Sequence, residues 1–228
     1  MIVVRSCSLA SSSLADVCPD FVSRYYDPGL QPLFFYGHHP KVDGIIDRAV
    51  FSQWASVVFS YNGDVYNCAE QWMMRHKAVC FGDKASEAAI MRSRSPKTHK
   101  AKGKKVTGFD PIVWASKADA VVRMGNYLKF SQNPALQAFL LSSYPRMLVE
   151  ASPDDTEWGI GMRESEARKL RPSAWRGKNR LGLALMATRE WLRTGTAPPP
   201  WKFIPSKIEA SVKSYFEKRG RKRKITDK

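Results

Sequence analysis

Cysteine and histidine are both scarce in this chain of 228 residues, which contains four of each. None of the cysteines stands in the C-x-x-C spacing of zinc sites, and the histidines are adjacent or isolated. We therefore expect no metal or other cofactor. The cysteines are expected to be reduced thiols in an intracellular protein.

Long apolar runs are also missing, so the sequence predicts no membrane span. Residues 1–18 have a single basic residue, Arg5, and their apolar residues are interrupted by serine. This composition does not favour a secretory signal or a transit peptide. We expect a nuclear or cytoplasmic protein with no membrane partner.

Acidic residues are few relative to basic ones, with 21 Asp and Glu against 37 Lys and Arg and a net charge of +16. Such an excess suits a polyanionic partner, although a solubilising charge spread over the surface is the alternative. The chain finishes in KRGRKRK, Lys218 to Lys224. That run is typical of a solvated tail, a nuclear-import signal or a nucleic-acid contact.

Chain length and turn signals predict one folded domain with two extensions. Residues 1–30 are expected to be a loosely ordered arm, and 31–194 a catalytic domain. The segment TGTAPPP ends that domain, and 195–228 form a Pro-rich break followed by the basic tail.

Within the domain, Asn62-Gly63 between apolar runs predicts a β-hairpin. Short strands are expected at Leu33 and over 146–151, and helices over 83–94, from Pro111, from Pro134 and over 179–193. The lysine-dense segment 96–105 predicts a solvated or anion-facing stretch.

The segment YNCAEQWMMRHKA, Tyr66 to Ala78, predicts a helix with an acid and a base on one face. Asn67 is the expected N-cap, with Glu70 three residues later as in a capping box. Lys77 follows two turns after Glu70, with Met73 between them on the same face. The alternative is that Glu70 only caps the helix and Lys77 only reaches solvent.

Seven segments stand in an order that resembles the NADAR family, which includes YbiA-like N-glycosidases. The resemblance covers about 34–192 and implies a compact, mainly helical α+β domain with a small hairpin and short strands. The segments are FFYGH, FSQW, YNCAEQWMMRHKAVCFGD, KGKKVTGFDPIVW, GNYLKFSQNPAL, LVEASPDDTEWGIG and WRGKNRLGLALMATRE.

The activity implied by the resemblance is hydrolysis of a bond between ribose C1 and an exocyclic amine. One substrate class is ADP-ribosylated guanosine in DNA, RNA or free nucleotide, with ADP-ribose as product. The other is the ribosylamino-pyrimidines of riboflavin synthesis. The basic tail favours the first, while a non-catalytic reader of ADP-ribose or nucleic acid is an alternative of another class.

Three residues carry the expected chemistry. A glycosylamine whose nitrogen keeps a hydrogen can open to an imine, and a neutral Lys77 could then form a Schiff base with the ribose. Glu70 would carry protons between the ring oxygen, the leaving amine and water, or stabilise positive charge at C1. By resemblance Asp155 is the second acid, although Asp154 competes with it and a turn role for Asp155 is the alternative.

The resemblance and the residue types also suggest residues that bind substrate. Trp114 could instead pack in the core, Lys129 could be solvated, and Asn179 could only cap a helix. The candidate binding residues are Tyr36, Gly37, Gln53, Met73, Trp114, Lys129, Trp158, Gly159, Gly161 and Asn179.

Overall fold

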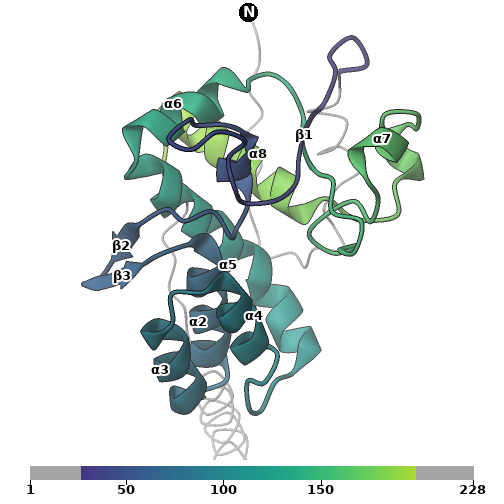
Figure 1. Ribbon diagram of the computed structural model, residues 1–228. Coiled ribbons are helices and arrows are strands. Elements are labelled where there is room, and N and C mark those ends of the chain that lie inside the picture. The colour runs from purple at the N-terminus through teal and green to yellow at the C-terminus, as the bar shows by residue number, and fades with distance from the viewer. Residues whose placement is uncertain (1–26, 199–228) are drawn as a thin grey trace, which may run out of the picture.

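The computed structural model describes residues 27–198 (Figure 1). Most of the predicted N-terminal arm and nearly all of the predicted basic tail lie outside these residues, so both boundaries stay predictions. Within the described part, Cys68 and Cys80 are both buried. None of the described helices has the length and apolar character needed to cross a membrane.

The described chain is a compact α+β domain that is mainly helical, as predicted. Its few short strands form two separate two-stranded sheets, one joining β1 to β4 and one joining β2 to β3. The elements are β1 (Leu33–Phe35), η2 (Arg48–Phe51), β2 (Phe59–Tyr61), β3 (Asp64–Tyr66), α2 (Ala69–Cys80), α3 (Lys84–Arg92), α4 (Pro96–Gly103), α5 (Pro111–Ser131), α6 (Pro134–Ser142), β4 (Leu148–Glu150), α7 (Glu164–Ala167), η3 (Pro172–Ala174) and α8 (Arg180–Thr194).

The predicted hairpin is present, with β2 and β3 paired antiparallel and Asn62-Gly63 at its tip. Asn62 and Gly63 both have positive φ, 50° and 85°. A two-residue hairpin turn of this kind requires that conformation, which Asn and Gly adopt more readily than other residues. The second pairing, the parallel one of β1 with β4, joins segments far apart in the chain and was not predicted.

The α2 helix begins one residue later than the capping-box pattern predicts. Its N-cap is Cys68, whose Sγ accepts from the backbone N–H of Gln71, so the prediction of Asn67 as the cap is wrong. Gln71, not Glu70, completes the box by accepting the backbone N–H of Asn67 at 2.8 Å. Cysteine is not among the strong N-cap residues, which is why the residue rules favoured Asn67. The shift leaves the Glu70 carboxyl free for another use.

The lysine-dense segment 96–105, predicted to be a solvated or anion-facing stretch, has exposed lysines and forms a helix, α4, which the sequence analysis did not predict. Ser95 caps it by accepting the N–H of Thr98, and Pro96 occupies its first turn. One side of α4 packs closely on α2 at Gly103. A Cβ at this position would lie 2.0 Å from the Sδ of Met74. Only glycine permits that approach.

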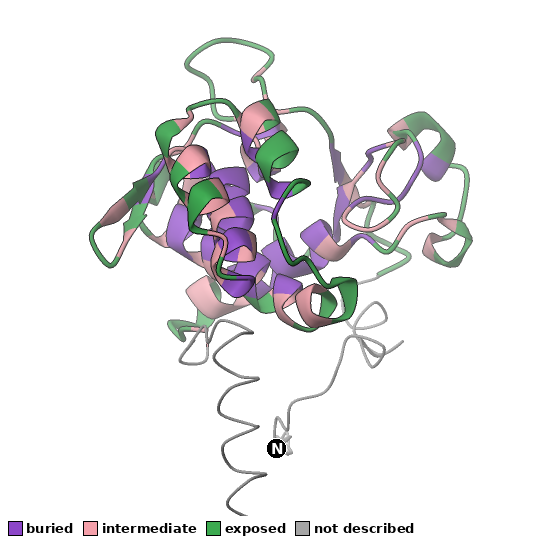
Figure 2. Ribbon diagram, turned by 90° about the horizontal axis from the view of Figure 1, so that it is seen from below, coloured by how far each residue is buried: buried purple, intermediate pink, exposed green. Residues whose placement is uncertain are grey.

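The core lies where α2 meets its neighbours. α2 packs against α3, α4 and α5, while α8 packs against α5 and β4. Trp72 on α2 is fully buried, and its indole N–H donates to the carbonyl of Val121 on α5 at 2.8 Å. Figure 2 shows the buried residues gathered on these central helices, with exposed residues on the outer helices and loops. α2 is thereby held rigidly from several sides.

Candidate active site

One face of α2 lines a cavity of about 710 Å³. Glu70, Met73, Met74 and Lys77 all belong to that lining, so the structure places the acid and the base at the same cavity. The predicted site residues that the lining contains are Tyr36, Gly37, Gln53, Glu70, Met73, Lys77, Trp114, Asp155 and Trp158.

Glu70 is the most deeply placed charged group of α2, with only 6% of its surface exposed. Its backbone N–H donates to the carbonyl of Gln53 at 2.9 Å, which fixes the start of the helix against the 50–54 loop. Burial raises the pKa of the Glu70 carboxyl to about 7, although Lys100 and a hydrogen bond with Trp54 act against the rise. A carboxyl with that pKa can both take up and release a proton at neutral pH.

Asp155 reaches the cavity from the opposite side, in the loop after β4. Its Oδ1 accepts the backbone N–H groups of Glu157 at 2.9 Å and Trp158 at 2.8 Å. Asp155 therefore makes the turn that was the alternative interpretation, and it also lines the cavity. Asp154 lines the cavity as well but is exposed.

A fourth carboxyl in the cavity belongs to Glu150, the last residue of β4, which sequence reasoning missed. Burial raises the pKa of Glu150 to about 8, and the neighbouring carboxylates of Asp155 and Glu70 add to the rise. The feature of the sequence that could have identified Glu150 is an acidic residue directly after two apolar residues, Leu148 and Val149, which are buried. Glutamate is rarely fully buried unless it is paired.

Lysines approach these carboxyls from α2 and α4. Lys77 is half-buried, and its Nζ lies 3.8 Å from the centroid of the Phe109 ring. Burial lowers the pKa of Lys77, while Glu70 opposes that effect. Lys100 is exposed and lines the same cavity, and so does Lys104. Sequence reasoning did not include these two, because it placed no helix over α4.

Aromatic side chains form much of the remaining lining, from three separate parts of the chain. Trp114 comes from α5 and is half-buried, so it serves the core and the cavity together. Trp158 is covered on one side by the guanidinium of Arg180, 4.5 Å from its ring. Trp54 was missed by sequence reasoning, although it lies in the quoted FSQW segment. Flat apolar walls of this kind suit a base or a ribose.

Residues 34–193 match the NADAR domain over most of the described chain. The chain belongs to the NADAR domain family. It is 40% identical over 163 residues to a protein of Acanthamoeba polyphaga mimivirus named as an N-glycosidase, covering 69% of this chain and 94% of that one.

Two further matches come from Escherichia coli. The N-glycosidase YbiA is 30% identical over 146 residues, covering 64% of this chain and 82% of YbiA. The NMR structure of the E. coli protein YbiA superposes with a TM-score of 0.58 at 27% identity, covering 73% of this chain and 88% of that one. The NADAR fold of this chain is thus shared with YbiA.

Lys129 of the NADAR domain lies outside the cavity lining, although it was predicted to meet substrate. It is fully buried, and its Nζ donates to the carbonyls of Val50 at 2.6 Å and Ser52 at 2.9 Å. Burial lowers its pKa to about 7. Lys129 therefore holds the loop that carries Gln53 and Trp54 into the cavity.

Three more predicted binding residues of the NADAR domain support the cavity without lining it. Asn179 precedes α8 but makes no side-chain cap; its Oδ1 accepts the N–H of Glu150 and its Nδ2 donates to the carbonyl of Leu148. A Cβ on Gly159 would lie 3.0 Å from the carbonyl oxygen of Glu150. Gly161 has a φ of 65°. Both glycines lie outside the cavity lining, so their role as binding residues stays a prediction.

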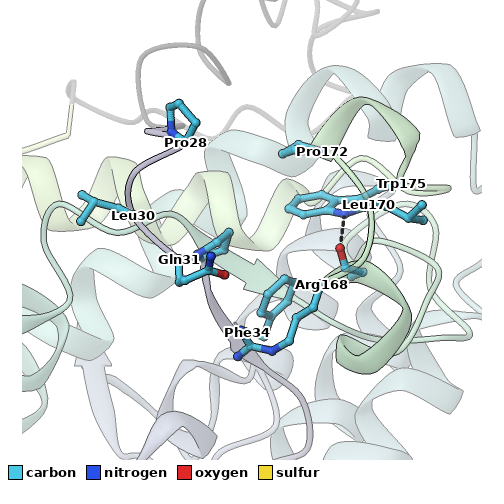
Figure 3. A pocket seen from close by; sticks show the side chains of 10 residues that line it. Pro28, Leu30, Gln31, Phe34, Arg168, Leu170, Pro172 and Trp175 are labelled. Atoms are coloured by element: carbon cyan, nitrogen blue, oxygen red, sulfur yellow. Dashed lines mark hydrogen bonds between the residues drawn. The ribbon is translucent and has the colours of Figure 1, made fainter.

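A second cavity of about 90 Å³ lies between β1 and the η3 region (Figure 3). Its centre is the edge-to-face pair of Phe34 and Trp175, with Arg168 over the Phe34 ring. Among the described residues that line it, Arg168 alone is charged, and Glu164 pairs with it at 2.5 Å. This cavity lacks the carboxyl and amine groups that proton transfer needs.

No group of three or more His, Cys, Asp or Glu side chains within residues 27–198 has an arrangement suited to a metal ion. The larger cavity offers carboxyls and amines, together with the imidazoles of His38 and His39. Acid, base and nucleophilic catalysis all use these side chains.

Proposed function

We propose that this protein is an N-glycosidase that hydrolyses the bond between ribose C1 and an exocyclic amine. The names of its relatives support this activity, since the mimivirus protein and YbiA are both called N-glycosidases. The observation that carries the proposal is the pairing, on one face of α2, of a half-buried Lys77 with a buried Glu70.

The proposed chemistry needs an amine that is partly neutral. Burial beside Phe109 lowers the pKa of Lys77, so a larger fraction of this lysine is uncharged than of an exposed one. Lys100 and Lys104 also line the cavity, but Lys100 is exposed. Lys77 is therefore the assigned nucleophile.

The reaction proceeds through an imine in this proposal. The substrate ring opens as the C1–O bond breaks, the ring oxygen takes a proton, and C1 forms a double bond to the exocyclic nitrogen. The Lys77 amine adds to C1, the original amine leaves with a proton, and a Schiff base to Lys77 remains. Water adds to that Schiff base, Lys77 leaves, and the free ribose closes its ring. The sum is one water consumed and one bond from C1 to nitrogen hydrolysed.

We further propose ADP-ribosylated guanine, in nucleic acid or as a nucleotide, as the substrate. The cavity volume of about 710 Å³ falls within the usual range for ligands of this size. Lys100 of α4 and Lys104 at its C-cap line it with cations that attract phosphate, and His38 and His39 from the segment after β1 also line it. The net charge of +16 suits a large anionic substrate.

A ribosylamino-pyrimidine of the riboflavin pathway is the second candidate substrate. It carries the same exocyclic C1–N bond, so the same residues would act on it. A non-catalytic reader of ADP-ribose is the alternative of another class, in which Glu70 and Lys77 would only shape the cavity.

The deciding experiment incubates the protein with an oligonucleotide carrying ADP-ribose on a guanine amino group, alone and with a ribosylamino-pyrimidine as competitor. Release of ADP-ribose and of the unmodified guanine, measured by chromatography, supports the proposal. Preferential hydrolysis of the pyrimidine supports the second substrate. Saturable binding without product would make the protein a reader and contradict the proposal.

A further inference from the structure

Glu150 is an acid that lines the larger cavity, and the reaction proposed above does not use it. Its Oε2 atom is buried and has no hydrogen-bond partner among the described residues. An unpaired buried carboxyl oxygen has lost its contacts with water without a replacement, so it calls for a physical explanation. The residue also lines the larger cavity, where a ligand could supply the missing partner.

The backbone of Glu150 is fixed on every side. Its N–H donates to Asn179 Oδ1 at 3.0 Å, and its carbonyl accepts the N–H of Ile160 at 2.9 Å. The parallel pairing of β4 with β1 places it opposite Phe35. A side chain that extends from so constrained a position is held in place for reaction, as catalytic groups are.

The charged neighbours of Glu150 favour its protonated form. Asp155 and Glu70 repel a negative charge there, and Lys100 is the cation that opposes them. Burial is the largest cause and acts in the same direction, and together these raise the pKa of Glu150 to about 8. A carboxyl that keeps its proton near neutral pH can act as an acid.

We propose that Glu150 is a catalytic residue, the proton donor to the departing amine, and that Asn179 is the positioning residue that holds it. This inference rests on the proposed N-glycosidase function. The Glu150 carboxyl gives its proton to the exocyclic nitrogen as the C1–N bond breaks and its electron pair moves to that nitrogen. The resulting carboxylate then takes a proton from the water that adds to the Lys77 Schiff base, which restores the starting state.

The test compares two leaving groups. Glu150→Gln keeps the size and neutrality of the protonated acid, so we expect it to fold. For the guanosine substrate we expect its rate to fall by about 10²–10⁴-fold. For the ribosylamine of para-nitroaniline, whose amine leaves with less protonation, the loss should be at least about tenfold smaller. Glu166→Gln, at an exposed residue paired with Arg176, is the matched control and should keep full activity.

Two further measurements make the assignment specific. Added formate should restore part of the activity of Glu150→Ala, because it can replace the missing acid. Asn179→Ala should shift the basic limb of the pH–rate profile, which depends on the ionisation of Glu150, whereas a merely structural residue would lower the rate at every pH. Equal losses on both substrates, without formate rescue, would overturn the proton-donor role.

Infrared spectroscopy separates this inference from the proposed function. The protonated-carboxyl band of the wild type at neutral pH should lose intensity in Glu150→Gln, and the part that remains belongs to Glu70, whose pKa is about 7. If the wild type hydrolyses neither substrate, the proposed function fails; the lost intensity then still supports Glu150 as the proton-donating group of the cavity. A band of equal intensity in the two proteins overturns the inference even if the enzyme is active.

Discussion

The two walls of the cavity are built in different ways. The α2 wall presents Glu70, Met73 and Lys77 from a single helix whose spacing alone brings them to one face. The opposite wall presents Glu150 and Asp155 from the end of β4 and the loop after it. That wall depends on pairing with β1 and on bonds to Asn179, both distant in the chain.

The two walls hold their cavity side chains in place by different contacts. On α2 the reactive groups extend from a helix buried against several others, so a changed side chain leaves the scaffold in place. On the opposite wall, and in the 50–54 loop beside it, each cavity group relies on one or two buried polar bonds. We therefore expect substitutions of the first kind to affect rate, and substitutions of the second kind to affect stability and rate together.

Among Glu70→Gln, Lys129→Met and Cys68→Ala, the largest effect is expected for Glu70→Gln. This change removes the charge but keeps the shape, so the rate of hydrolysis should fall by about 10²-fold or more without loss of the fold. Steady-state kinetics and circular dichroism measure the two quantities. Normal turnover of this variant would mean that the α2 wall does not handle protons.

The same variant should be more stable than the wild type at high pH. Burial raises the pKa of Glu70 from 4.5 to about 7 in the folded protein, so folding favours the protonated form. The stabilising effect of that proton is complete below the unfolded pKa and is lost as the pH rises through about 7. In urea unfolding, Glu70→Gln should exceed the wild type by up to about 3 kcal/mol near pH 8 and by little near pH 4. Equal pH dependence in the two proteins would contradict the burial of this carboxyl.

Lys129→Met tests a support residue. It leaves the carbonyls of Val50 and Ser52 without their donor, which should lower the unfolding free energy by about 2 kcal/mol. The loosened loop carries Gln53 and Trp54, so KM should rise as well. Lys102→Met, at an exposed position of α4, is the control. Unchanged stability with lost affinity would instead make Lys129 a direct ligand of the substrate.

The smallest effect is expected at the start of α2. Cys68→Ala removes the sulfur that accepts the N–H of Gln71 and should cost about 1 kcal/mol of stability, as N-cap losses do. Cys68→Ser should recover most of it, and neither change should alter the rate. A rate loss comparable to that of Glu70→Gln would show that this buried thiol takes part in the chemistry.

Local signals made part of the fold and site predictable. Asn62-Gly63 specified the hairpin, Asp110 before Pro111 specified the start of α5, and the seven-residue spacing of Glu70 and Lys77 specified a shared face. All three depend on residues close in sequence.

Long-range contacts explain what sequence reasoning missed. α4 has few apolar residues, and packing of Gly103 on Met74 holds it on the core. Glu150 enters the site only because β4 pairs with β1. Lys129 looked like a solvated or phosphate-binding lysine, since nothing near it in sequence shows its bonds to Val50 and Ser52. Each miss is a contact between residues that local patterns do not connect.

The central claim is that Lys77 forms a covalent bond to the ribose, and trapping that bond tests it most directly. The protein is incubated with substrate or ADP-ribose and then with borohydride, which reduces a Schiff base to a stable adduct. Mass spectrometry should locate the adduct on the peptide that contains Lys77. Lys100→Ala should keep the adduct, whereas Lys77→Ala should lose both adduct and turnover. Lys77→Arg should bind ligand without turnover, because a guanidinium stays protonated. An active Lys77→Arg, or an adduct on another lysine, would contradict the account.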